Sequence, residues 1–142
     1  MQLKVQRMYE DVKLPVYATE GAACFDIYGY DIVDAGDNTE TYSTGLKFEV
    51  PVGQVLKVYS RSGHGFKKDI RLANSVGIID SDYRGELLVK LTCDDSTKGF
   101  VDVRKGERIA QAMLEPVERV EFVDVSELSG TVRGSNGFGS TN

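Results

Sequence analysis

The chain has 142 residues, of which 41% are hydrophobic and 27% charged, and these values predict one domain with a sizeable buried core. Its formal net charge of −5 argues against a protein that coats nucleic acid, because that function requires a basic surface. No apolar run is long enough to span a membrane and no signal peptide begins the chain, so we expect a cytoplasmic protein without membrane or nucleic-acid partners.

Short segments of alternating apolar residues recur along the chain, and each predicts a β-strand. They cover residues 3–5, 25–27, 46–50, 55–58, 87–91, 101–103 and 120–125. Turn-forming residues separate them, and a short helical turn is expected only within residues 62–72. Many short strands with frequent turns predict an all-β sandwich, jelly roll or barrel.

Asp26 is a carboxylate inside the apolar segment of residues 22–27. A buried carboxylate without a partner would cost free energy, so Asp26 requires an arginine, a backbone donor or a metal ion. Cys24 and Cys93 lack the spacing of a pair and are expected to be buried free thiols, as in a reducing compartment. A single histidine without a cysteine pair gives no zinc ligand set, so any metal would be a hard cation held by carboxylates and phosphates.

A turn that could bind an anion follows the predicted strand at residues 55–58. Arg61, Ser62 and Gly63 offer a guanidinium, a hydroxyl and unhindered backbone donors. His64 comes next, and we expect it to be a solvated turn residue, because a neighbour two positions from Ser62 rarely has the geometry of a Ser–His pair.

Residues 77–86 predict a second site, on a hairpin whose returning strand is residues 87–91. Free backbone groups along its inner side could pair with a flat heterocycle. The alternative is an ordinary hairpin in which Asp82 and Arg84 are solvated. Asp80 follows two apolar residues, so we expect it to be partly buried and able to act as a general base on water.

Gln111 lies between Ala110 and Ala112, which indicates a polar group admitted to a mostly buried surface. Such a group makes a fixed hydrogen bond, either to the backbone or to a ligand. Gln111, together with the arginines, hydroxyls and carboxylates named above, favours an enzyme that hydrolyses nucleoside triphosphates. Such an enzyme would not use a Walker-type loop, since no Gly-Lys-Ser/Thr sequence is present.

The C-terminal residues 126–142 show no periodicity, and they could extend on the order of 55 Å, far enough to reach another subunit. We therefore expect one β domain over residues 1–125 and a flexible arm over residues 126–142. Glycine-rich termini are commonly disordered. This one also carries Arg133, suited to phosphate, and Phe138, whose ring could close onto a base between Gly137 and Gly139. The arm is therefore a candidate nucleotide lid.

In order and spacing, these five segments resemble the five motifs of the homotrimeric dUTPase family, over residues 22–141. The resemblance implies a distorted jelly roll or β-barrel of the β-clip type, assembled as a homotrimer with active sites shared between subunits. It implies Mg²⁺-dependent hydrolysis of dUTP to dUMP and diphosphate by attack of water on the α-phosphorus. Such an activity limits uracil incorporation into DNA and supplies dUMP for dTMP synthesis.

The resemblance also implies roles for individual residues. Asp80 would orient and deprotonate the attacking water, and Tyr83 would pack under the deoxyribose and exclude a 2′-hydroxyl. The uracil edge would be read by Asn74, Gly77, Ile78, Ile79, Asp80 and Leu88. The phosphates would be held by Arg61, Ser62, Gly63 and Gln111, with Arg108 as a structural partner. Asp26 would hold Mg²⁺ through water. From the arm, Phe138 would stack on uracil, and the γ-phosphate would be bound by Arg133, Gly139, Ser140 and Thr141.

The sequence departs from the family motifs at Cys24, where a glycine is usual, at Ser60, where a proline is usual, and at His64, where a leucine is frequent. The serine is expected to loosen the phosphate turn. Two alternatives remain open: a dCTP deaminase of the same superfamily, and a nucleotide-sensing regulator that binds dUTP and switches an unknown protein partner. The identity of the products distinguishes the deaminase from the hydrolase.

Overall fold

The structure is a computed structural model that describes residues 1–139, over which the chain forms nine strands and one helix. In chain order they are β1 (Lys4–Arg7), β2 (Phe25–Tyr28), β3 (Asp31–Gly36), β4 (Thr39–Glu49), β5 (Gln54–Tyr59), α1 (Ser62–Lys68), β6 (Ile70–Leu72), β7 (Gly77–Ile79), β8 (Glu86–Cys93) and β9 (Arg108–Pro116). The helix has seven residues, and in the described part of the chain no helix is long and apolar enough to cross a membrane.

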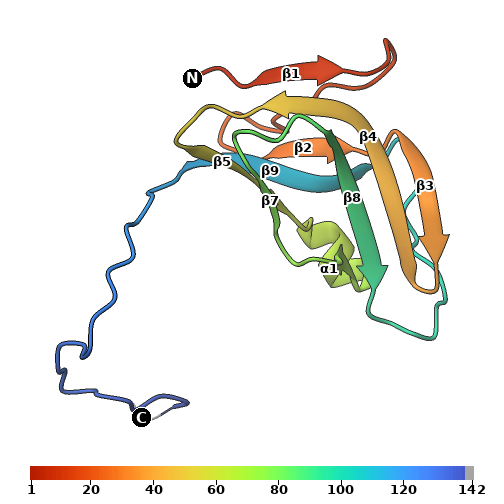
Figure 1. The fold of residues 1–142 in the computed structure, drawn as a ribbon. Helices are drawn as coiled ribbons and strands as arrows, with labels where there is room; N and C mark the ends of the chain where they lie inside the picture. The colour runs from red at the N-terminus through yellow and green to blue at the C-terminus, as the bar shows by residue number, and fades with distance from the viewer. Residues whose placement is uncertain (140–142) are drawn as a thin grey trace.

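The strands form two antiparallel sheets (Figure 1). One sheet has the order β1-β4-β8-β6, with β3 also paired to β4, and the other has the order β2-β9-β5-β7. Strands far apart in sequence are therefore neighbours, as in a jelly roll. This architecture confirms the predicted all-β fold of the jelly-roll type.

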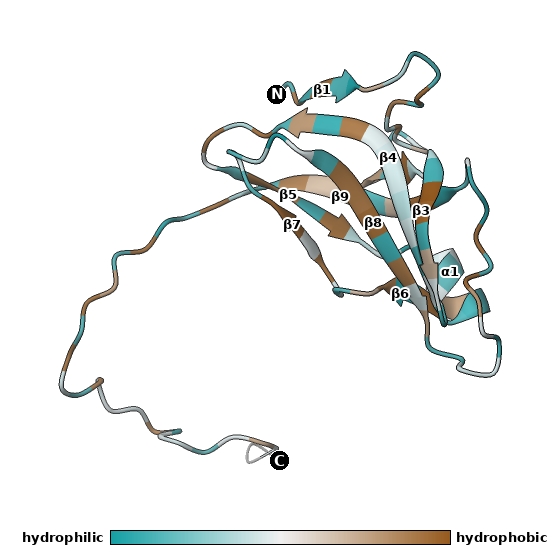
Figure 2. Cartoon of the chain, turned by 45° about the vertical axis from the view of Figure 1, so that its right-hand side comes forward, coloured by the Kyte–Doolittle hydropathy of each residue, from teal (hydrophilic) through white to brown (hydrophobic). Residues whose placement is uncertain are grey.

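The core lies between the two sheets and is filled by alternate residues of their strands. In β8, every second residue from Leu87 to Cys93 is buried, and Leu56 and Val58 of β5 and Ile109 of β9 meet them from the other sheet. Figure 2 shows the hydrophobic segments along β5, β8 and β9. The alternation of apolar residues in the sequence thus matches the alternation of buried residues along the strands.

Two of the seven predicted strands are wrong. Residues 101–103 are irregular although Val101 and Val103 are buried, because the N–H of Val103 donates to the carbonyl of Val101 (2.9 Å) in a tight turn instead of to a neighbouring strand. Residues 120–125 form no strand and are exposed, although their alternation resembles that of a strand. They pair with no strand among residues 1–139 of this chain.

Some strands escape prediction because their residues show no regular apolar alternation. β3 is exposed along its whole length, and the first half of β4 is rich in threonine and tyrosine. These segments are strands because β4 is paired on both sides, with β3 on one edge and β8 on the other. Tertiary pairing therefore overrides local composition.

The expected helical turn is α1, which ends at Asp69 in a left-handed conformation (φ 59°). The expectation that His64 is solvated is wrong, since only 6% of it is exposed. His64 lies on the inward side of α1. Leucine is frequent at this position in the family, which agrees with a buried side chain.

After β9 the chain leaves the body of the molecule. The N–H of Val117 still donates to the carbonyl of Gly53 (2.9 Å), and residues 118–139 then extend away without strand or helix (Figure 1). Val120, Phe122 and Val123 are largely exposed along this segment. Several apolar side chains of residues 118–139 are therefore uncovered in a single chain.

Candidate active site

The carboxylate of Asp26 is clamped between two arginines. It lies on β2, opposite Gln111 of β9, and is 8% exposed. Its Oδ1 accepts from Nε of Arg61 (3.3 Å) and its Oδ2 accepts from Nη1 of Arg108 (3.1 Å). The two guanidinium groups offset the cost of burying the carboxylate. Of the three kinds of partner expected for Asp26, the structure supplies arginine.

The turn at Arg61 is fixed from several strands. Nη1 of Arg61 donates to the carbonyl of Arg108 (3.2 Å), and Nε2 of Gln111 donates to the carbonyl of Ser60 (2.9 Å). Sequence reasoning left a backbone or a ligand partner open for Gln111, and this contact is to the backbone. The amide keeps a second N–H that the contact to Ser60 does not use.

Ser60 also joins the turn to the other sheet. Its Oγ accepts from the backbone N–H of Leu72 in β6 (2.9 Å). Proline has no hydroxyl and could not make this bond. The bond opposes the loosening that the absence of a proline ring was expected to cause.

Ser62 and Gly63 follow Arg61 as the exposed first residues of α1. The first N–H groups of a helix have no partner within it, and the helix dipole favours an anion beside them. No acidic side chain lies in this first turn. Asp26, Arg61, Ser62, Gly63, Arg108 and Gln111 therefore form one cluster with donors available to an anion.

The residues predicted to read a base lie in a different place, between β7 and β8. The predicted hairpin is not a paired one: β7 pairs with β5 in one sheet, while β8 pairs with β4 and β6 in the other. β7 is the edge strand of its sheet, and β6 covers β8 only at residues 91–93. The two arms are therefore splayed, and each turns an open backbone edge toward the gap.

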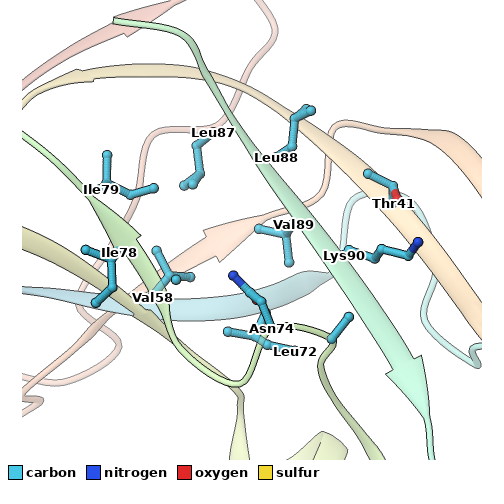
Figure 3. A pocket seen from close by; sticks show the side chains of 12 residues that line it. Thr41, Val58, Leu72, Asn74, Ile78, Ile79, Leu87, Leu88, Val89 and Lys90 are labelled. Carbon is cyan, nitrogen blue, oxygen red and sulfur yellow. The ribbon is translucent and has the colours of Figure 1, made fainter. Parts of the chain in front are cut away.

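A pocket of about 460 Å³ fills this gap (Figure 3). Its lining includes five residues that the sequence predicted together: Asn74, Gly77, Ile78, Ile79 and Leu88. A Cβ at Gly77 would lie 3.1 Å from Cβ of Val58 on the paired strand, so a side chain at this position would crowd β5. An apolar pocket flanked by free backbone donors and acceptors suits a planar heterocycle.

Sequence reasoning missed Thr41 and Lys90, which also line this pocket. They face each other across β4 and β8, and Lys90 lies two residues after Leu88, so both project from the same side of β8. The alternation of β8 could have identified Lys90 as a companion of Leu88. Thr41 could not be found, because its strand was not predicted.

Asp80 and Tyr83 continue from β7 into a turn. The N–H of Tyr83 donates to the carbonyl of Asp80 (3.2 Å), and the Tyr83 hydroxyl donates to the carbonyl of Glu86 (2.9 Å). The ring lies against Gly85, where any Cβ would collide with it. The expectation that Asp80 is partly buried is wrong, since this turn leaves it exposed. Asp80, Tyr83 and Leu88 line a smaller pocket of about 250 Å³.

Asp80 and the cluster at Arg61 lie at opposite ends of β5, whereas Gly77 pairs with Val58, near the Arg61 end. Ile79 pairs with Leu56, so Asp80 stands level with Val55, whereas Arg61 lies six residues farther along the chain. At about 3.3 Å per residue, this separation is roughly 20 Å. The structure therefore does not bring Asp80 and Arg61 of one chain together.

Within residues 1–139, no group of three histidine, cysteine or acidic side chains could hold a metal ion. Each oxygen of the Asp26 carboxylate accepts one hydrogen bond. An ionised carboxylate can accept about four, so each oxygen can still accept another. Asp26 therefore fits a cation through water but could not hold one alone. Most of the ligands would have to come from substrate phosphates, as is common for Mg²⁺.

The dUTPase family model matches residues 10–142 of this chain. The chain belongs to the dUTPase family. A deoxyuridine 5′-triphosphate nucleotidohydrolase of Nautilia profundicola is 42% identical over 142 residues, covering 99% of each chain. Another dUTPase relative, from a Hydrogenobaculum species, is 43% identical over 99% of this chain and 98% of its own. The chain is thus an enzyme of a hydrolase family.

The dUTPase fold is also seen in solved structures. A variant of the dUTPase of Staphylococcus bacteriophage 80alpha, solved with dUpNHpp, has a TM-score of 0.84 and 24% identity, covering 99% of this chain and 98% of the phage chain. This similarity establishes the common fold.

The arm that carries the fifth dUTPase motif is described as far as Gly139. Nε of Arg133 donates to the carbonyl of Asn136 (2.8 Å), and Phe138 is fully exposed with a left-handed backbone (φ 52°). Over residues 118–139, no hydrogen bond or ion pair joins the arm to the body. Ser140 and Thr141, which were predicted to bind phosphate, lie outside the described residues.

Proposed function

We propose that this enzyme hydrolyses dUTP to dUMP and diphosphate. The observation that carries the proposal is the pocket between β7 and β8, lined by five residues that the family pattern assigns to uracil. Open strand edges offer backbone donors and acceptors in a fixed order. Uracil and cytosine differ in that order, and a site built for one rejects the other because its polar groups would remain unpaired.

Asp80 acts as the general base in this proposal. Its carboxylate lies just beyond the pocket, on the turn that also carries Tyr83, so it can approach the α-phosphorus of a nucleotide whose base is bound between the strands. It orients a water molecule and removes its proton as the oxygen attacks phosphorus and diphosphate leaves. The Tyr83 ring packs under the sugar and leaves no room for a 2′-hydroxyl.

The phosphates are bound by the cluster at the start of α1. Arg61 and the backbone of Ser62 and Gly63 provide donors, and Gln111 provides its second amide N–H. The clamp on Asp26 sets the direction of the Arg61 guanidinium. Asp26 would help to hold Mg²⁺ through water beside the triphosphate, and the ion would supply neutralisation of the phosphate charge.

Each complete site combines residues of several copies of the chain, assembled as a homotrimer. The separation of roughly 20 Å between Asp80 and Arg61 supports this, because neighbouring phosphates of one nucleotide could not reach both residues in one chain. The uncovered arm supports it as well. Another copy supplies Phe138 to stack on uracil, and supplies Arg133, Gly139, Ser140 and Thr141 to bind the γ-phosphate.

The consequence for the cell is that uracil is kept out of DNA and that dUMP becomes available for dTMP synthesis. The test is to offer dUTP, dCTP, dTTP and UTP separately with Mg²⁺ and to identify the products. We expect dUMP and diphosphate from dUTP alone. Ammonia from dCTP would establish the deaminase alternative, and binding of dUTP without turnover would favour the regulator.

A further inference from the structure

His64 is a buried titratable group that the proposed reaction does not use. It is the only histidine in the chain, and 6% of it is exposed. Its Nδ1 is buried and has no hydrogen-bond partner among the described residues. Buried polar atoms are nearly always paired, so an unpartnered ring nitrogen directly behind the phosphate turn requires an explanation.

The charges around His64 are mainly positive. The charges that act on it are those of Arg61, at the N-cap of α1, Lys68, at the end of that helix, and Glu107 and Arg108, before and at the start of β9. Three cations thus oppose one carboxylate. Burial, followed by the charges of Arg61 and Lys68, lowers the pKa of His64 from its ordinary value of 6.5. The ring is therefore neutral in the free protein at pH 7.

We propose that His64 is a positioning residue that takes up a proton from solvent when a triphosphate binds at Arg61, Ser62 and Gly63. The inference rests on the proposed function, which supplies the anion. His64 follows Gly63 directly in α1, so a polyanion on this turn would lie near the ring and offset the positive charges around it. Both ring nitrogens of the protonated form are donors.

The coupling follows from electrostatics. Without an anion, a proton on His64 is repelled by Arg61, Lys68 and Arg108. With phosphates on the turn, the same proton is attracted, and within a protein such interactions are stronger than in water. Because binding linkage is reciprocal, a proton on His64 strengthens triphosphate binding as much as the triphosphate strengthens proton binding.

The single histidine makes the proposal directly measurable. In protein labelled with ¹⁵N-histidine, every imidazole signal belongs to His64, so its pKa can be followed by NMR with and without dUpNHpp and Mg²⁺. We expect the pKa to rise by about one unit or more on binding, the range produced by a nearby opposite charge. An unchanged pKa in a saturated complex would overturn the proposal.

Calorimetry in two buffers of different ionisation enthalpy gives a second readout. At about pH 6.5, where a histidine titrates, wild type should take up more protons on binding dUpNHpp than His64→Gln, which cannot titrate, or His64→Leu, which has the residue frequent in the family. Equal uptake in all three proteins would mean that only the nucleotide titrates, and it would overturn the role of His64 while leaving the proposed function intact. No binding in wild type would overturn both.

Discussion

Nε of Arg61 lies 3.3 Å from Oδ1 of Asp26, so the residue that begins the phosphate turn is tied to a buried carboxylate on another strand. Asp26→Asn removes the negative charge of this side chain and keeps its size and shape. We expect the free energy of unfolding to fall by about 1.5–3 kcal/mol, the usual worth of hydrogen bonds to a charged group. KM for dUTP should rise, because Arg61 loses its orientation.

Chemical denaturation and steady-state kinetics test this prediction. Asp102→Asn is the control, since it also removes a carboxylate paired with a cation, Lys68 (3.2 Å), but at an exposed site. Exposed pairs contribute under about 1 kcal/mol. Equal losses in the two variants would argue against a special role for the buried clamp.

Asp80→Asn tests the general base. We expect kcat to fall by at least ~10²-fold, the lower range for losing such a group, with a smaller change in KM. Asp82→Asn, two residues away on the same exposed turn, should keep its activity. A fully active Asp80→Asn enzyme would remove Asp80 from the mechanism.

Gly85→Ala tests the position of the Tyr83 ring. The new Cβ would collide with that ring, which must then leave the place where we propose that it packs under the sugar. We expect the preference for dUTP over UTP, measured as the ratio of the two kcat/KM values, to decrease. Tyr83→Phe keeps the ring and removes only the bond to the carbonyl of Glu86, so its preference should decrease less. The opposite order would point to the hydroxyl as the discriminating group.

The buried neutral His64 makes stability depend on pH. Its pKa is lowered in the folded state, so below about pH 6.5 the unfolded chain binds more protons than the folded one. Stability should therefore fall as the pH drops from 6.5 through the folded-state pKa, and this contribution should be constant above that range. Denaturation curves of wild type and His64→Gln between about pH 5 and pH 8 isolate the effect, which should be absent in the variant.

Deletion of residues 133–142 tests the arm. No hydrogen bond or ion pair joins residues 118–139 to the body, so the truncated chain should keep its melting temperature and its trimeric state while losing most of its activity. Refolding it together with Asp80→Asn chains should restore part of the activity, because mixed trimers contain sites with both an intact arm and an intact Asp80. A mixture as inactive as its components would contradict sharing of sites between subunits.

Much of this molecule can be predicted from its sequence because strand alternation and motif order are local properties. β8 shows this for the fold. For the site, Asn74, Ile78 and Leu88, which motif order groups together, lie around one pocket. What could not be predicted depends on tertiary pairing. The arms at β7 and β8 belong to different sheets, which no local pattern reveals, and the exposure of Asp80 follows from that separation.

The open edge of β7 has a further consequence. Unpaired strand edges invite pairing with other chains and so promote aggregation, and proteins commonly keep such edges short. β7 has only three residues, and Gly77 is among them. So short an edge is a poor template for a second polypeptide, yet it is long enough to pair with a single flat ring. A short edge therefore leaves backbone groups free for a ligand while offering another chain few groups to pair with.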